Sequence, residues 1–273
     1  MQEKSCRILR GGGGINILFF VDNDIKKQNT LIKVCNKEFA VKAPNAILCH
    51  DFDKVIVASV CGENIITQLL KSLKIAREKI DSTLIDFYQQ GLRSFLEKFS
   101  YLLKDKNLKG AVAELGVYQG DSAKWINYYF KERKIYLFDT FEGYALGDIN
   151  ADKDDEAREF GEGHLCDTSI KMVMDKMTYP QNCVIKKGVF PQSAKGVEDD
   201  FVFVNLDPDL YKVVLAGLEF FYPRLVKGGA IIVSYFSPHN GPKRALDAFL
   251  TKHHLKTMPI PLGFGNGVAL VKE

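Results

Sequence analysis

Residues 110–143 read GAVAELGVYQGDSAKWINYYFKERKIYLFDTFEG, and this stretch decides the fold. Its first apolar run, 111–115, stops at Gly116, and a second glycine follows at Gly120 before a segment that can form a helix. A second apolar run then ends in Asp139. Strand, glycine turn, helix, strand and acid predict a nucleoside-binding βαβ unit, because an acid that ends the second strand can accept two hydrogen bonds from a ribose diol.

The form of the glycine turn favours S-adenosylmethionine as the nucleoside. The glycines do not follow the G-x-G-x-x-G pattern of dinucleotide sites, and no Lys-Ser or Lys-Thr pair follows them as in a P-loop. The turn instead opens E-x-G-x-x-x-G. S-adenosylmethionine carries a sulfonium and an amino acid tail, and it has no pyrophosphate that would need the N-terminus of a helix.

Five stretches carry a resemblance to a known family. They read VAELGVYQGDSAKW, YLFDTFEGY, VIKKGVFPQS, FVFVNLDPDLY and FFYPRLVKGGAIIV, in that order. Over roughly residues 85–273 the chain resembles the macrocin O-methyltransferase (TylF-type) family. The resemblance implies the seven-stranded sheet of class I methyltransferases. It also implies transfer of a methyl group from S-adenosylmethionine to a sugar hydroxyl, in antibiotics or bacterial surface glycans.

The candidate cofactor residues lie in the turn and at the ends of the next two strands. We expect Glu114 and Gly116 beside the methionine moiety and Asp139 beside the ribose, although Asp139 could instead only cap its strand. Gly188 and Ser193 follow a later strand, where adenine is expected. The full set of predicted cofactor residues is Glu114, Gly116, Tyr118, Gly120, Ser122, Asp139, Gly188 and Ser193.

A metal site is the point at which the sequence departs from the family pattern. VNLDPDLY places Asp207 and Asp209 at the end of an apolar strand, where open α/β sheets bind ligands. The resemblance implies that one of these carboxylates joins an acidic pair after the GG…II strand to hold Mg²⁺. Here Ser234 and Tyr235 stand in place of that pair. Hard cations need several oxygen ligands, so we expect no tight Mg²⁺ site, and Asp207 could instead orient substrate or act as a base.

Two histidines are further candidates for the base that removes the proton of an acceptor hydroxyl. His164 lies in an acid-rich stretch, 148–167, which we expect to cross the mouth of the active site, although it could instead be a solvated surface loop without a role. The resemblance implies a catalytic His in this region, but neighbouring acids would raise the pKa of His164. His239 follows the altered metal strand. The predicted catalytic set is therefore His164, Asp207 and His239.

The chain divides into three predicted parts. Residues 1–80 form a small, incomplete Rossmann-like α/β domain, with expected strands at 16–21 and 54–60. Its glycine run precedes the first strand, so it offers no phosphate cradle. Residues 81–105 form an amphipathic connecting helix that packs on the following sheet and could also serve a homo-oligomer. Residues 106–273 form the methyltransferase domain, an α/β fold with a mostly parallel sheet.

Composition limits the partners. The net charge of +3 gives no electrostatic case for nucleic acid or a membrane surface, and no apolar run is long enough to span a bilayer. The N-terminus lacks the apolar core of a signal peptide. The six cysteines form no CxxC pair, so we expect reduced thiols in a cytoplasmic protein without a zinc site.

Three functions remain open at this stage. The first is an O-methyltransferase acting on a nucleotide-linked or glycan-bound sugar. The second is a non-catalytic protein that binds S-adenosylmethionine or a nucleotide sugar, which the altered metal strand would explain. The third is a methyltransferase acting on a small phenol. Transfer of a labelled methyl group would separate an enzyme from a binding protein.

Overall fold

The structure is a computed structural model, and it describes residues 16–59, 62–144, 165–237, 240–263, 265 and 267–273. The chain forms two compact units, Met1–Ile85 and Asp86–Glu273.

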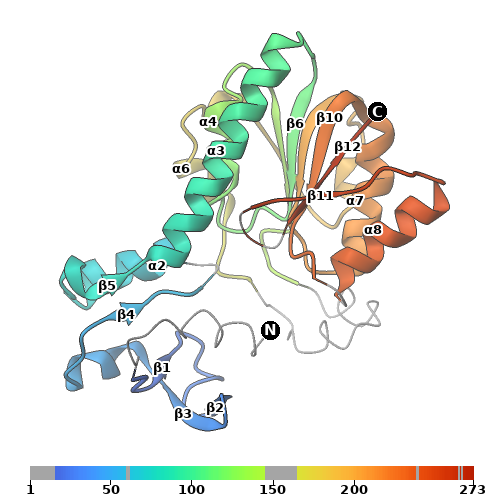
Figure 1. The fold of residues 1–273 in the computed structure, drawn as a ribbon. Coiled ribbons are helices and arrows are strands. Elements are labelled where there is room, and N and C mark those ends of the chain that lie inside the picture. Colours follow the sequence, from blue (N-terminus) through green and yellow to red (C-terminus); the bar gives the residue numbers. More distant parts are fainter. Residues whose placement is uncertain (1–15, 60–61, 145–164, 238–239, 264, 266) are drawn as a thin grey trace. The chain divides into compact units, whose positions relative to one another are not determined.

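The second unit is built on a seven-stranded sheet with the order β11-β12-β10-β9-β6-β7-β8 (Figure 1). The strands β6 to β10 are parallel, and β12 runs antiparallel to both β10 and β11. The strand bounds are β6 (Ala111–Leu115), β7 (Ile135–Asp139), β8 (Cys183–Lys187), β9 (Phe201–Leu206), β10 (Leu225–Val233), β11 (Ile260–Pro261) and β12 (Val268–Val271). The predicted α/β fold with a mostly parallel sheet is confirmed.

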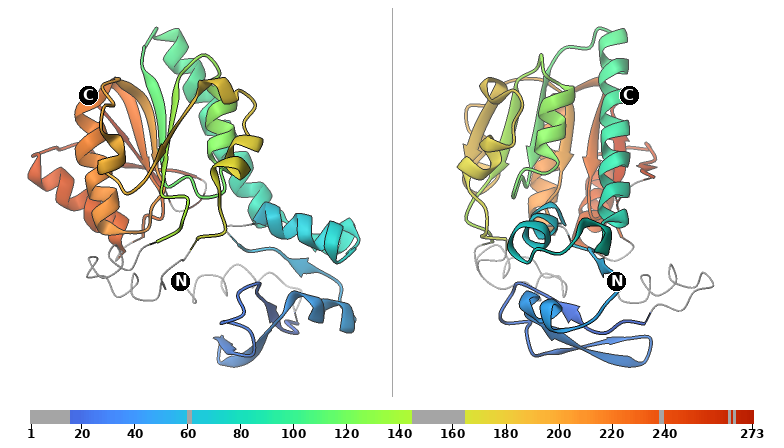
Figure 2. Two further views of the ribbon diagram at one scale, coloured as in Figure 1. Left: turned by 180° about the vertical axis from the view of Figure 1, so that it is seen from behind. Right: turned by 90° about the vertical axis from the view of Figure 1, so that its left-hand side faces the viewer.

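Helices cover both faces of this sheet (Figure 2). One face carries α3 (Thr83–Asp105), α4 (Ala123–Tyr129) and α6 (Ile170–Asp175), and the other carries α7 (Tyr211–Arg224) and α8 (Gly241–Lys252). Short 3-10 helices η5 (Pro180–Asn182) and η6 (Gln192–Ala194) flank β8. Covering both faces explains why β6 and β9 are buried along their whole length and read as continuous apolar runs.

The amphipathic pattern predicted for 81–105 forms helix α3. Asp81 accepts a hydrogen bond from the Thr83 backbone N–H at 3.0 Å, so it caps the first turn. Leu92, Leu96 and Leu103 are buried in the core beneath the sheet. From residue 86 onward, α3 is therefore part of the second unit.

The first unit differs in detail from the prediction. Its expected strand at 16–21 is reduced to β1 (Phe20–Val21), and the one at 54–60 to β4 (Val55–Ile56). Strand β1 pairs in parallel with β3 and is followed along the chain by a β2–β3 hairpin, while β4 pairs with β5 in a separate sheet. The remaining elements are β2 (Leu31–Val34), β3 (Lys37–Lys42), η1 (Pro44–Cys49), α2 (Gly62–Thr67), η2 (Gln68–Ser72, a π-helix), η3 (Arg77–Lys79) and β5 (Ile80–Asp81).

The prediction that all six cysteines are reduced is wrong for Cys35, which forms a disulfide bond. Cys49, Cys166 and Cys183 are free thiols. Spacing in the sequence could not show this, because a disulfide depends on how the fold brings two cysteines together. Among the helices in the described ranges, none is long and apolar enough to cross a membrane.

Candidate active site

The candidate residues gather where the parallel strands end. The chain leaves β6 for β7 on one side, whereas β9 lies on the other side of β6. The carboxyl ends of β6 and β9 are therefore a topological switch point, where open α/β sheets bind their ligands. Gly116 follows β6, Asp207 follows β9, and Asp139 ends the neighbouring strand β7.

The turn after β6 brings three left-handed residues close together. Gly116, Tyr118 and Gly120 have φ values of 85°, 48° and 80°. A Cβ on Gly116 would come within 3.1 Å of the Pro208 backbone N, so only glycine fits between this turn and the end of β9. Tyr118 lacks that freedom, and its conformation must be held by neighbouring groups.

Asp139 is fixed by backbone donors. One carboxylate oxygen accepts the Tyr118 N–H at 2.8 Å, and the other accepts the Phe141 N–H at 2.7 Å. Each carboxylate oxygen can accept a second hydrogen bond, so the pair still has the capacity to bind a diol. The Gly188 N–H donates to the Asp139 carbonyl oxygen at 2.9 Å, which joins the end of β8 to the same place.

Glu114 is a fully buried carboxyl group with one unused oxygen. Its Oε1 accepts hydrogen bonds from Ser122 Oγ at 2.5 Å and from Asn205 Nδ2 at 2.7 Å. Its Oε2 is buried and has no hydrogen-bond partner among the described residues. Burial, with a further contribution from the Asp207 charge, raises the pKa of Glu114 to about 8. A buried carboxyl oxygen without a hydrogen-bond partner destabilises the fold unless a ligand donates a hydrogen bond to it.

Ser193 carries a second buried group without a hydrogen-bond partner among the described residues. Its hydroxyl oxygen is buried without a partner in the described part of the chain. Its Cβ lies 3.7 Å from the position that a Cβ on Gly188 would take. The structure therefore brings Gly188 and Ser193 close together and leaves a buried hydroxyl that a ligand could satisfy. Their place beside the adenine stays a prediction.

Asp207 is the central carboxyl group on the β9–β10 side. Ser234 donates a side-chain hydrogen bond to it, and burial raises the pKa of Asp207 to about 7 in spite of that bond. The Asp207 N–H also donates to the Leu115 carbonyl oxygen at 2.9 Å, which ties the ends of β9 and β6 together. An acid with a pKa near 7 can accept a proton at neutral pH.

Three tyrosines face the acids of this side. Burial is the first cause that raises the pKa of Tyr88, Tyr144 and Tyr235, and the charge of Asp207 contributes to each. Asp209 contributes to two of them, and its backbone N–H lies 3.5 Å from the Tyr144 hydroxyl. These phenols come from α3, from the segment after β7 and from the segment after β10.

Ser234 and Tyr235, at the predicted metal position, bring no carboxylate group to the site. Tyr235 has φ 52°, and Asn240 Nδ2 donates to its carbonyl oxygen. Ser234 supplies a neutral hydroxyl that is already bound to Asp207. Among the described residues, no group of three or more His, Cys, Asp or Glu could hold a metal ion. The predicted bases His164 and His239 lie outside the described residues.

Sequence reasoning missed several residues of this site. Asn205 donates to Glu114, and its polar side chain within an apolar strand was the available signal. Tyr88 lies in the amphipathic helix predicted at 81–105, and nothing in the sequence sets it apart from the apolar residues of that helix. Ser122 was predicted from the sequence, and its hydroxyl donates to Glu114; its contact with the cofactor stays a prediction.

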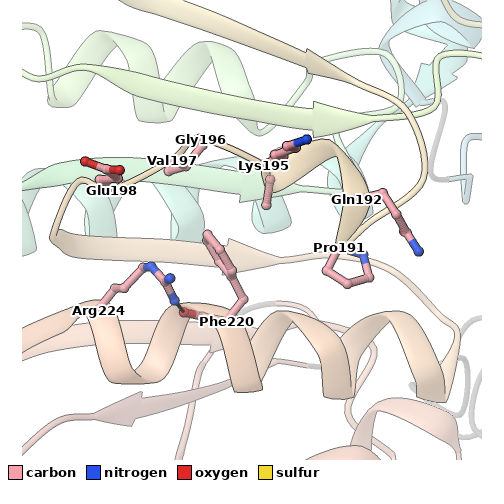
Figure 3. Close-up of a pocket in the computed structure, with 9 residues that line it drawn as sticks. Pro191, Gln192, Lys195, Gly196, Val197, Glu198, Phe220 and Arg224 are labelled. Carbon is pink, nitrogen blue, oxygen red and sulfur yellow. Dashed lines mark hydrogen bonds between the residues drawn. The ribbon is translucent and has the colours of Figure 1, made fainter.

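A separate shallow pocket of about 500 Å³ lies between the 191–198 loop and α7 (Figure 3). None of the predicted site residues lines it. Arg224, beside the Phe220 ring in Figure 3, lies 4.1 Å from the ring centroid and donates to the Phe220 carbonyl oxygen at 2.8 Å. Its guanidinium is thus engaged within the fold, and we assign no function to this pocket.

The strand order and the switch-point site define a class I methyltransferase, and solved structures agree. The O-methyltransferase NovP is 17% identical with a TM-score of 0.57, over 77% of this chain and 97% of its own. CalS11, a calicheamicin methyltransferase, is 17% identical with a TM-score of 0.51, over 81% of this chain and 98% of its own. At such identities the likeness shows the fold.

The family model of macrocin O-methyltransferase (TylF) matches residues 79–262. The chain therefore belongs to the macrocin O-methyltransferase family, and it is an S-adenosylmethionine-dependent O-methyltransferase. No curated protein matches the chain in sequence.

Proposed function

We propose that this enzyme methylates a hydroxyl group of a sugar, carried by a nucleotide or a glycan. The observation that carries the proposal is the buried Asp207 carboxyl group at the switch point, with hydroxyl-bearing side chains around it. A sugar hydroxyl is a poor nucleophile and must lose its proton as it attacks. CalS11 is described as a TDP-rhamnose 3'-O-methyltransferase, which supports this acceptor class.

The residues on the β6–β7 side fit S-adenosylmethionine. The orphan Glu114 Oε2 and the Gly116 turn would hold the methionine moiety, and Asp139 would accept the ribose hydroxyls. Gly188 and Ser193 would lie beside the adenine, where the Ser193 hydroxyl lacks a partner. The cofactor supplies an activated methyl group, so the protein must align the acceptor and exclude water.

The residues on the β9–β10 side would handle the acceptor. Asp207 accepts the proton of the attacking hydroxyl, and Ser234 orients that carboxylate through its hydrogen bond. Asp209 and the phenols of Tyr144 and Tyr235 can bind neighbouring sugar hydroxyls. His164 and His239 remain alternative bases on sequence grounds.

This site would work without a tightly bound metal. A hard cation prefers several oxygen ligands with one or more carboxylates, and Ser234 with Tyr235 supplies only neutral ones. We therefore derive no step through Mg²⁺. Hydrogen bonds to Asp207, in place of a cation, would then stabilise the negative charge of its carboxylate.

The test is transfer of labelled methyl groups from S-adenosylmethionine to a panel of nucleotide sugars, deacylated glycans and catechols, with and without EDTA. We expect label in a sugar acceptor, no effect of EDTA, and loss of transfer in Asp207→Asn. If the label enters only a catechol, the acceptor is a phenol and the proposal of a sugar acceptor is wrong. Binding of the cofactor without transfer to any acceptor class would favour the non-catalytic alternative.

A further inference from the structure

Tyr118 lies at the centre of a hydrogen-bond network that extends beyond the glycine turn. Its backbone N–H donates to Asp139, its carbonyl oxygen accepts the Thr168 hydroxyl, and its own hydroxyl donates to Asp167 at 2.6 Å. A non-glycine residue at φ 48° is disfavoured. Two of these three contacts come from residues 167–168, which lie about 50 positions later in the chain.

Asp167 binds the turn a second time through the next residue. Gln119 is buried, and its Nε2 donates to the Asp167 carbonyl oxygen at 2.8 Å and to Asp167 Oδ2 at 3.0 Å. Both carboxylate oxygens of Asp167 therefore accept donors from the turn. Asp139 accepts the Tyr118 backbone N–H and Asp167 accepts the Tyr118 hydroxyl, so both acids bind this residue of the turn.

The segment that follows Asp167 stays on the same turn. A Cβ on Gly120 would lie 3.1 Å from Val173 Cγ1 of α6, so α6 packs closely against the turn at this position. Lys176 Nζ forms an ion pair with Asp121 Oδ1 at 2.5 Å, and both side chains are mostly buried. These contacts hold residues 167–176 against the turn and make the position of Asp167 definite.

We propose that Asp167 is a positioning residue for cofactor binding. It holds Tyr118 in the left-handed conformation in which the Tyr118 N–H fixes the Asp139 carboxylate for the ribose. Asp167 itself does not touch the cofactor in this arrangement and acts through Tyr118. The inference rests on the ribose role of Asp139 under the proposed function.

The experiment measures the dissociation constants of S-adenosylhomocysteine and of its 2′-deoxy analogue by calorimetry on the full chain. In Asp167→Asn the constant for S-adenosylhomocysteine should rise about 3- to 10-fold, the range of one typical net hydrogen bond, because Asp167 acts on the cofactor only through Tyr118. The difference between the two ligands should shrink, because a loosened Asp139 gains less from the 2′-hydroxyl. Asp175→Asn, which breaks the exposed Lys171–Asp175 pair on α6, is the matched control and should change neither constant.

A second pair of variants keeps the test independent of folding. Tyr118→Phe removes the donor to Asp167, and Asp167→Asn should add less in that background than in the wild type. Thr168→Val removes the hydroxyl that binds the Tyr118 carbonyl oxygen and should also weaken binding.

Unchanged affinity in Asp167→Asn would overturn the inference, and so would equal weakening of both ligands, which would mean general loosening of the scaffold. Asp139→Asn separates the two levels of the argument. If that variant also leaves affinity unchanged, the proposed cofactor site fails. If it weakens binding while Asp167→Asn does not, only the role of Asp167 fails.

Discussion

The two sides of the switch point are built from different parts of the chain. On the β6–β7 side, Asp139 is fixed by the backbone N–H groups of Tyr118 and Phe141. On the β9–β10 side, Asp207 depends on a side chain, the hydroxyl of Ser234. Most substitutions leave backbone hydrogen-bond donors in place, whereas a single substitution removes a side-chain donor. The backbone-held β6–β7 side suits a methyl donor that many enzymes share, and the β9–β10 side suits an acceptor that differs from one enzyme to another.

The largest expected effect is on the β9–β10 side. Asp207→Asn should lower the rate of methyl transfer by about 10²- to 10⁴-fold, the usual contribution of a general base. The affinity for S-adenosylhomocysteine should stay near the wild-type value, because the backbone contacts of residue 207 remain. Labelled transfer and calorimetry together check this.

The same group sets the pH dependence. Burial raises the pKa of Asp207 to about 7, and a base works only when deprotonated. Activity should therefore rise as the pH passes through about 7. A rate that is flat from pH 6 to pH 8 at saturating cofactor, or a residual rate above about one tenth in Asp207→Asn, would move the base role to His164 or His239.

On the β6–β7 side, Asp139→Ala should weaken S-adenosylmethionine binding by about 1.5–3 kcal/mol, the scale of hydrogen bonds to a charged acceptor. Calorimetry measures it directly. The rate at saturating cofactor should fall much less than in Asp207→Asn. If the two variants affected binding and rate alike, the division into two sides would not hold.

Substitutions at the predicted metal position test the β9–β10 side by a gain of Mg²⁺ affinity. Wild type should bind Mg²⁺ no tighter than about millimolar, because Ser234 and Tyr235 carry no formal charge at neutral pH. Ser234→Asp with Tyr235→Asp should tighten binding by about 10-fold or more, since carboxylates supply both ligand oxygens and charge balance. Titration calorimetry with Mg²⁺ measures both proteins. Micromolar binding by wild type would show ligands that we have not identified.

Glu114 should make stability depend on pH. Its pKa is raised by burial from 4.5 to about 8, so the folded state holds a proton that the unfolded state has lost. The free energy of unfolding should therefore be highest below about pH 4.5, as far as this group is concerned, and fall as the pH rises towards 8. Glu114→Gln should remove that slope and raise stability near pH 8 by about 1–3 kcal/mol. Urea unfolding of both proteins across this range is the measurement, and parallel slopes would contradict the assignment.

The smallest effect is expected in the first unit. In its described part, β1 leads into a turn at 24–29 and then a hairpin, so no helix N-terminus follows the strand to receive a pyrophosphate. Thermal shifts of the full chain with NAD or NADP at about 1 mM should be less than about 1 °C. A shift of several degrees with either ligand would show a nucleotide site in this unit.

The sequence predicted the second unit well because its signals are local. An apolar run such as 111–115 forms a strand between two covered faces, and the spacing from Gly116 to Asp139 follows from one βαβ unit. The left-handed Tyr118 could not be predicted, since its conformation depends on Asp167 and Thr168 far along the chain.

The first unit was predicted less well for the same reason. Apolar residues at 16–21 and 54–60 suggested two long strands, yet among the described residues of these ranges only Phe20–Val21 and Val55–Ile56 pair with other strands. A strand forms only beside a partner strand, and the pairing of β4 with β5 depends on the tertiary fold, which the local sequence does not reveal. The clustering of Tyr88, Tyr144 and Tyr235 around Asp207 could not be predicted for the same reason, because the three residues lie in separate segments of the chain.

The central pairing of the sheet also bears on how the protein is made. Strand β6 pairs with β9, and Ala111 meets Phe201, so roughly 90 residues separate partners that lie side by side. At about 5–20 residues per second, a ribosome delivers β9 on the order of 5–20 s after β6. During that interval one edge of the apolar strand β6 has no partner strand in the nascent chain, because β9 has not yet been synthesised. Biosynthesis of this chain should therefore depend on chaperones more than its stability once folded would suggest, and slower translation should lengthen that dependence.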